Sequence, residues 1–206
     1  MAEPTYSSRE QLHEMILDLA MQEFIARGIR AVKMDDLAQQ MGISKRTIYE
    51  IFENKEEMLF ECVNRAMTQQ SQRIMAMLAQ SDNVIDFIVS FYRLKIEESQ
   101  KVSTDFYTDL MRYPRVNELL RSEQSHVREM RERLFLRGVK EGYFRADLDF
   151  ELVSTTMEEL TMTAAQKLFY KKFGIHELFR NLFLIIIRGI CTQKGVERLD
   201  LQFSHL

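Results

Sequence analysis

Glycine, proline and cysteine are scarce in this sequence. The 206 residues include seven Gly, two Pro and two Cys, and there is no Trp. So few Gly and Pro residues leave little room for long loops, while Met, Leu, Glu, Gln and Arg favour helices. A chain of this length can bury about 70% of the surface of its unfolded state. We therefore expect a stable all-α protein.

Cysteine and histidine form no pattern that predicts a metal or redox site. Cys62 and Cys191 are far apart in the sequence, with no Cys-x-x-Cys pair and no neighbouring His, and the four His residues are scattered. Structural zinc and redox motifs need a defined ligand spacing. We expect two buried thiols, and we assign no metal and no cofactor.

Long hydrophobic runs are missing as well. The longest uninterrupted apolar run is residues 182–187, whereas a helix needs about 20 such residues to span a bilayer. The first residues lack the pattern of a cleavable signal. We expect a soluble, cytoplasmic protein with no membrane partner.

The acidic pairs in the sequence do not predict an active site. Asp35 and Asp36 are adjacent along a predicted helix, so their carboxylates point to different faces, and the pairs at 97–98 and 158–159 share this arrangement. No nucleophile elbow or phosphate-binding loop is present. The sequence therefore argues against an enzyme.

Residues 34–55 have the pattern of two short helices joined by a tight turn. One apolar stripe of helical period consists of Met34, Leu37, Ala38 and Met41. Gly42 can end the first helix in a left-handed conformation, and Ser44 can cap the second. The second helix would bury Ile48, Ile51 and Phe52 and expose Lys45, Arg46, Thr47 and Tyr49.

This pattern predicts a DNA-binding helix-turn-helix, in which the second helix presents its N-terminal side chains to the major groove. Lys and Arg can neutralise phosphates or donate to guanine, and hydroxyl groups can contact phosphate. The alternative is a helical pair that serves only packing, because such motifs are weakly specific on periodicity alone.

The residues from Gly28 to Leu59 resemble the N-terminal domain of the tetracycline-repressor (TetR) family. The resemblance rests on Asp36-Leu37-Ala38, Gly42-Ile43-Ser44-Lys45 and Thr47-Ile48-Tyr49, followed by Phe52, Lys55 and Glu56. With the preceding helix it covers about the first 60 residues. It implies a nine-helix, two-domain architecture, with a three-helix DNA-binding domain at 8–60 and an effector-binding and dimerisation domain at 61–206.

The resemblance also implies which residues contact DNA, and this chain departs from the family at several of them. Together with the exposed residues named above, the candidate set is Lys33, Ser44, Lys45, Arg46, Thr47, Tyr49 and Lys55. Val32 and Lys33 replace the usual pair of threonines, so a hydroxyl cap is missing and Lys33 is a candidate phosphate contact. Arg46 stands where a small residue is frequent, and Glu50 replaces an aromatic residue or histidine. The target sequence therefore cannot be inherited from the family.

The charge of the N-terminal region is unfavourable for DNA binding. Residues 1–60 carry 7 Lys or Arg and 11 Asp or Glu, a net charge of −4, whereas DNA-binding domains are usually basic. Positive residues do gather around the second helix of the motif. With few phosphate contacts per subunit, we expect that dimerisation is needed for useful affinity.

Helix breakers and caps divide the rest of the chain. After a frayed segment at 1–7, we expect a helix that Ser7 or Ser8 caps and Gly28 ends, and one long helix from Lys55 to about Gln80. Further helices are expected near 83–99, 101–112, 115–139, 149–171 and 176–193, with a loose tail at 195–206.

Two sets of apolar residues in this second part have alternative explanations. By resemblance, a small apolar or aromatic effector would bind near Phe91, Tyr107, Met111 and Tyr113, although aromatic and Met residues at helical spacing also form ordinary core. A twofold dimer interface would use Met157, Leu160, Ala164, Leu168, Leu182, Phe183 and Ile186, unless these face an internal core.

These features favour a homodimeric transcriptional repressor that binds a pseudo-palindromic operator and is released by a small-molecule effector. Double-stranded DNA and a second copy of the chain are the expected partners. The alternative is an activator, or an architectural or scaffold protein of the same fold that binds DNA without an effector.

Overall fold

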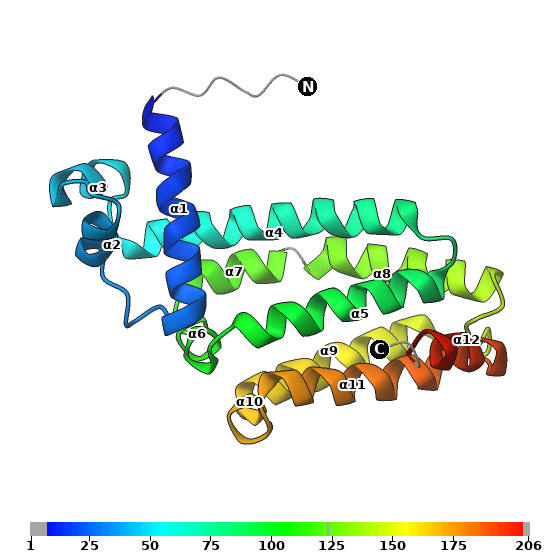
Figure 1. The fold of residues 1–206 in the computed structure, drawn as a ribbon. Coiled ribbons are helices and arrows are strands. Elements are labelled where there is room, and N and C mark those ends of the chain that lie inside the picture. Colours follow the sequence, from blue (N-terminus) through cyan, green and yellow to red (C-terminus); the bar gives the residue numbers. More distant parts are fainter. Residues whose placement is uncertain (1–7, 123, 204–206) are drawn as a thin grey trace. The chain divides into compact units, whose positions relative to one another are not determined.

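The computed structural model describes residues 8–122 and 124–203, apart from the side chains of residues 124–126, 165 and 166. This part of the chain is all-α, as expected, and holds twelve helices (Figure 1). Their bounds are α1 Ser8–Arg27, α2 Met34–Gln40, α3 Lys45–Ile51, α4 Lys55–Gln80, α5 Val84–Lys101, α6 Thr104–Leu110, α7 Pro114–Ser122, α8 Gln124–Lys140, α9 Phe150–Gln166, α10 Phe169–Phe173, α11 Ile175–Ile190 and α12 Gln193–Phe203. The frayed segment expected at 1–7 lies outside the described residues.

The chain forms two compact units, and their division does not follow a single cut in the sequence. The first unit comprises the residues up to Gln70 together with Val102–Leu120. The second comprises Ser71–Lys101 and the chain from Arg121 onward. The boundary therefore falls within α4, which is one helix as expected. Each unit has its own hydrophobic core.

The core of the first unit joins the four N-terminal helices to α6 and the start of α7. Fully buried side chains from α1 and α3 meet those of α4, and Phe106, Leu110 and Val116 complete the cluster. The backbone N–H of Ser103 donates to the carbonyl of Ile25 at 2.8 Å, so α6 begins beside the end of α1 (Figure 1). Residues 102–120 are thus part of the unit that holds the helix-turn-helix.

An ion pair and a cation–π contact attach α7 to α4 within the same unit. The guanidinium of Arg115 lies 2.5 Å from the carboxylate of Glu57 and 4.7 Å from the ring centroid of Phe60. The Ser103 hydroxyl also caps α6 by accepting from the N–H of Phe106 at 3.2 Å. The two contacts of Arg115 join segments of the first unit that lie 55 to 58 residues apart in the sequence.

The second unit packs α5 against α8, α11 and α12 around a separate core. Ile85, Val84 and Leu199 are fully buried in it, and Tyr92 of α5 contacts the rings of Phe183 and Phe203 at centroid distances of 5.0 Å. Arg198 of α12 also donates to both carboxylate oxygens of Asp86 at 3.0 Å. This helix lies where a loose tail was expected, and that prediction was wrong.

The described residues hold more helices than the expected nine. Over the helix expected at 115–139 they form α7 and α8, and residue 123 between these lies outside the described residues. The helix expected at 149–171 ends at Gln166, because Leu168 has φ of +54°, a left-handed conformation that a right-handed helix cannot pass. The short helix α10 follows that turn. Another addition is α12, which buries Leu199 completely.

None of the described helices combines the length and the apolar character that crossing a membrane would require.

Candidate nucleic-acid interface

The turn between α2 and α3 is fixed by backbone hydrogen bonds. Gly42 has φ of +67°. Its N–H donates to the carbonyl of Gln39 at 3.1 Å, and the N–H of Ile43 donates to that of Ala38 at 3.0 Å. This pair of bonds is a Schellman motif, which satisfies carbonyls at a helix end and usually requires glycine. The expected break at Gly42 is confirmed, and it sets the direction in which α3 leaves α2.

The N-terminus of α3 is capped as the sequence predicts. The Ser44 hydroxyl accepts from the backbone N–H of Thr47 at 3.1 Å and lies 2.8 Å from the Thr47 hydroxyl. Ile48 is buried in the core, whereas Tyr49 is 50% exposed. One face of α3 therefore anchors the helix and the other is open to solvent. By contrast, Lys33 at the N-cap position of α2 makes no side-chain cap, consistent with the missing hydroxyl.

The two cations at the start of α3 both pair with carboxylates of the same chain. Lys45 Nζ lies 2.5 Å from Asp35 Oδ2, and this hydrogen bond raises the pKa of Lys45 above its ordinary value. Arg46 Nε lies 2.6 Å from Glu50 Oε1, one helical turn away. Both pairs are exposed, and exposed pairs are weak enough to exchange for other anions. The exposed face of α3 is thus close to neutral until such an exchange occurs.

Lys55, the first residue of α4, makes its hydrogen bonds within the first unit. Its ammonium donates to the backbone carbonyls of Ile29 and Val32, both at 3.0 Å. Burial lowers the pKa of Lys55 below its ordinary value. Its donors are therefore directed into the loop between α1 and α2. Lys33 and Ser44 are the N-cap residues of α2 and α3, and Lys45, Arg46, Thr47 and Tyr49 lie on α3. The contacts of these residues and of Lys55 with DNA stay predictions.

Arg9 of α1 supports the other end of α3, and nothing in the sequence identified it. Its guanidinium donates to the carbonyl of Glu50 at 3.2 Å. A cation is favourable at a helix C-terminus because carbonyl groups there lack helical partners. The first turn of α1 thus stabilises the last turn of α3.

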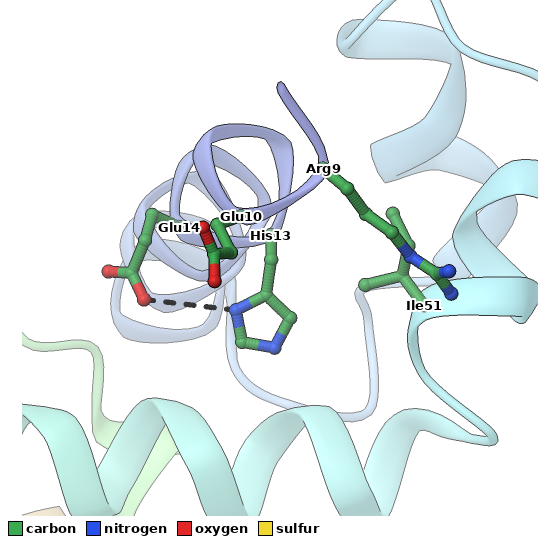
Figure 2. Close-up of a pocket in the computed structure, with 5 residues that line it drawn as sticks. All are labelled: Arg9, Glu10, His13, Glu14 and Ile51. Atoms are coloured by element: carbon green, nitrogen blue, oxygen red, sulfur yellow. Dashed lines mark ion pairs between the residues drawn. The ribbon is translucent and has the colours of Figure 1, made fainter. Parts of the chain in front are cut away.

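An open hollow lies beside this contact and is shown in Figure 2. Its lining consists of Arg9, Glu10, His13 and Glu14 from α1 and Ile51 from α3. His13 Nε2 lies 2.9 Å from a carboxylate oxygen of Glu61 on α4, and its ring stacks on that of Phe52 at 4.8 Å. The hollow is rich in carboxylates, which disfavours DNA there. Among the described residues, no cluster of His, Cys, Asp and Glu could hold a metal ion.

The four residues predicted to bind an effector do not belong to one unit. Tyr107 and Tyr113 pack against the core of the first unit, and Met111 at the end of α6 is 48% exposed. Burial raises the pKa of Tyr113, with Asp109 as the second cause. Phe91 lies in α5 of the second unit and stacks on Phe87 at 6.1 Å. Their role in effector binding stays a prediction.

The residues predicted for a dimer interface differ widely in exposure. Leu160 is 40% and Leu168 39% exposed, and Leu168 lies in the turn after α9 and not on the helix. Ala164 is buried, and Phe183 packs on Tyr92 inside the second unit. The other three, Met157, Leu182 and Ile186, are half-buried. Further apolar side chains on these helices are more exposed, namely Leu152 at 68% and Ile185 at 69%.

Known proteins similar to this chain include regulators with a helix-turn-helix. Residues 16–62 match the family described as bacterial regulatory proteins, tetR family. The chain is 28% identical over 192 residues to the HTH-type transcriptional repressor KstR2 of Mycobacterium tuberculosis, covering 88% of this chain and 93% of that protein. A second relative, KstR2 of Rhodococcus jostii, is 27% identical over 186 residues, with 86% and 90% covered.

Solved structures show the same fold. A transcriptional regulator from Saccharomonospora viridis, in complex with choline, has a TM-score of 0.71 and 21% identity, with 89% of this chain and 100% of that chain covered. The ketosteroid transcriptional regulator KstR2 of Mycobacterium tuberculosis has a TM-score of 0.57 and 24% identity, with 93% and 99% covered.

Proposed function

The chain belongs to the tetR family of bacterial regulatory proteins through its residues 16–62, and from this premise we propose that it is a homodimeric, ligand-responsive transcriptional repressor. Its relatives are regulators of transcription and not enzymes. The observation that carries the proposal is the Schellman turn at Gly42 followed by the capped, exposed N-terminus of α3. That arrangement presents Lys45, Arg46, Thr47 and Tyr49 to a major groove.

The relatives named KstR2 are repressors, which favours repression over activation. An activator, or an architectural DNA-binding protein without an effector, is the alternative. An in vitro transcription assay separates a repressor from an activator, because a repressor lowers the yield of transcript from a promoter that holds the selected site. A rise in yield with added protein would instead support the activator.

DNA binding is tested by selecting duplexes from a random pool and by mobility shifts on the DNA upstream of the protein's own gene. We expect a shift that weakens steeply with salt, because phosphate contacts release counterions. The preferred sequence should contain two half-sites about one helical turn apart. A protein that shifts no duplex from either source at low salt would refute the proposal.

Arg46 offers a test for a single base contact. Replacing Arg46 with Ala should relax preference at one position of each half-site, at a cost of roughly 1 to 3 kcal/mol for a bidentate base contact. Arg27→Ala is a matched control, because Arg27 forms a similar ion pair over one helical turn with Glu23 at 2.7 Å, on α1. Equal losses on selected and random DNA for Arg46→Ala would make it a phosphate contact.

The dimer proposal is supported by apolar side chains exposed on α9 and α11. Leu152, Leu160 and Ile185 are 68%, 40% and 69% exposed, and a partner subunit would remove this apolar surface from water. Leu160→Glu should shift sedimentation toward the monomer and weaken operator binding. Leu136→Glu on α8 is a control at a residue of similar type that is 58% exposed. Equal behaviour of the two variants would argue against this interface.

The effector is proposed to be a small apolar or aromatic molecule. Support comes from the aromatic and Met side chains at 107–113 and from the description of KstR2 of Mycobacterium tuberculosis as a ketosteroid regulator. Ketosteroids are therefore the first compounds to test. A true effector should raise the melting temperature and also release the operator. If no compound of this class does both, the architectural alternative gains support.

A further inference from the structure

A buried carboxylate in α6 contacts the loop that leads into the helix-turn-helix. Asp109 is 7% exposed, and its Oδ2 accepts from the backbone N–H of Arg30 at 2.8 Å. The loop comes very close to α6 at Gly28, where an added Cβ would lie 2.9 Å from Asp105 Cβ and 3.3 Å from Asp109 Oδ2. A carboxylate is rarely buried unless its oxygens are satisfied. The hydrogen bond from Arg30 therefore stabilises the buried position of Asp109 against this loop.

Lys55 contacts the same loop through a positively charged donor, whereas Asp109 contacts it through an acceptor. Its ammonium donates to the carbonyls of Ile29 and Val32 at 3.0 Å, while Asp109 accepts from the N–H of Arg30 that lies between them. The loop at 28–33 is thus held by one buried anion and one half-buried cation. Hydrogen bonds to charged groups are stronger than neutral ones, so both bonds restrict the loop.

This loop determines where α2 begins. Val32 is 1% exposed and Lys33 is the N-cap residue of α2, and the cap makes no side-chain hydrogen bond of its own. The contacts from Lys55 and Asp109 therefore substitute for a missing local cap. Since the Schellman turn fixes α3 relative to α2, the placement of the loop is transmitted to the face of α3.

We propose that Lys55 and Asp109 are positioning residues for DNA recognition, which hold the loop at 28–33 from two sides, and that Lys55 serves this loop and not a DNA phosphate. The inference rests on the proposed DNA-binding function. It predicts that both residues affect the discrimination between operator and random DNA. A phosphate contact would instead affect all duplexes alike.

The test compares Lys55→Met and Asp109→Asn with the control Lys33→Met in the full-length protein. Each variant keeps the approximate size of the native side chain and removes its charge. Operator and random duplexes are titrated over a range of salt. For Lys55→Met and Asp109→Asn we expect operator affinity to fall about tenfold or more, with random DNA much less affected and the salt slope unchanged. The exposed control Lys33→Met should weaken both duplexes alike and reduce the salt slope by about 0.9 per subunit.

Amide hydrogen exchange gives a second readout that needs no DNA. Both positioning variants should speed exchange at Arg30 and in α2, while Lys33→Met should not. Reduced salt slope with equal losses on both duplexes for Lys55→Met would overturn the proposal, as would unchanged exchange in either variant. A merely structural role would lower the melting temperature but leave the ratio of operator to random affinity unchanged, and this outcome also overturns it.

The two proposals fail in distinguishable ways. If the wild-type protein binds no duplex, the proposed function fails. Exchange at Arg30 and in α2 then decides whether Lys55 and Asp109 hold the loop. If the wild-type protein binds its operator and the two variants keep wild-type discrimination, only the positioning role fails. Circular dichroism confirms that each variant is folded.

Discussion

Two glycines in the first unit have left-handed backbone conformations but very different surroundings. Gly28 has φ of +84° and lies against α6, where an added Cβ would be 2.9 Å from Asp105 Cβ. Gly42 has φ of +67°, and an added Cβ would meet nothing within 4 Å. Gly28→Ala and Gly42→Ala therefore carry a similar backbone penalty and differ in packing. The difference between their free energies of unfolding therefore measures how tightly α6 contacts the loop before α2.

The expected magnitudes follow from these surroundings. A left-handed conformation costs a residue with a Cβ about 1 to 2 kcal/mol, and the reduced entropy of the unfolded chain returns roughly 0.4 to 1 kcal/mol. Gly42→Ala should therefore lower the free energy of unfolding by about 1 kcal/mol. Gly28→Ala adds an overpacking cost of about 1 to 3 kcal/mol, for a total of about 2 to 4 kcal/mol.

Thermal unfolding followed by circular dichroism would show the difference. For a chain of this size 1 kcal/mol corresponds to roughly 2 to 4 °C, so Gly42→Ala should lower the melting temperature by a few degrees and Gly28→Ala by about 5 to 15 °C. Gly28→Ala should also weaken operator binding, because it displaces the loop that leads into α2. Equal melting temperatures for the two variants would refute the close contact between α6 and this loop.

Four other substitutions test three separate features. Glu50→Gln releases Arg46 from an exposed ion pair. If the proposed dimer holds two such pairs at about 0.3 to 0.5 kcal/mol each, the variant should bind any duplex about three- to fivefold more tightly in mobility shifts. Weaker operator binding would show instead that Glu50 contacts a base. Burial raises the pKa of Cys62 from 9.0 to about 12. The folded protein therefore retains a proton that the unfolded chain loses above pH 9, and stability from this group is complete below pH 9 and falls toward pH 12 by up to about 1.4 kcal/mol per pH unit. Urea titrations of Cys62→Ala should show a weaker pH dependence over this range, and an unchanged one would contradict the assignment. Gly195→Ala places a Cβ against the Tyr143 carbonyl oxygen and should destabilise the second unit by about 1 to 3 kcal/mol. Gly189→Ala, whose added Cβ meets nothing within 4 Å, should stabilise α11 by about 0.5 to 1 kcal/mol. If urea unfolding showed Gly195→Ala to be the more stable of the two variants, this packing would be contradicted.

Local signals in the sequence predicted the helix-turn-helix and most helix boundaries. The apolar stripe of α2, the left-handed Gly42 and the Ser44 cap are properties of neighbouring residues, so they are visible without a structure. These features were confirmed because each depends on hydrogen bonds over a few residues.

Features that depend on distant parts of the chain could not be predicted. Nothing in the sequence indicated that the Lys55 ammonium donates to two carbonyls about 25 residues earlier. Asp109 was not identified at all, since its partner Arg30 is 79 residues away. The helix α12 did carry a signal, because Val196, Leu199 and Phe203 share helical spacing. Gly195 obscured that signal, although glycine is needed there for close approach to Tyr143.

The membership of α6 in the first unit changes how an effector would act on DNA binding. Tyr107 packs on the same core as α3 and α4, and Tyr113 lies three residues after the end of α6. Asp109 lies between them in sequence and contacts the loop before α2. A ligand that binds beside these tyrosines and moves α6 therefore changes a contact of the DNA-binding unit itself. Such coupling needs only one helix with two positions, each favoured by a different ligand, and not a long chain of intermediate residues.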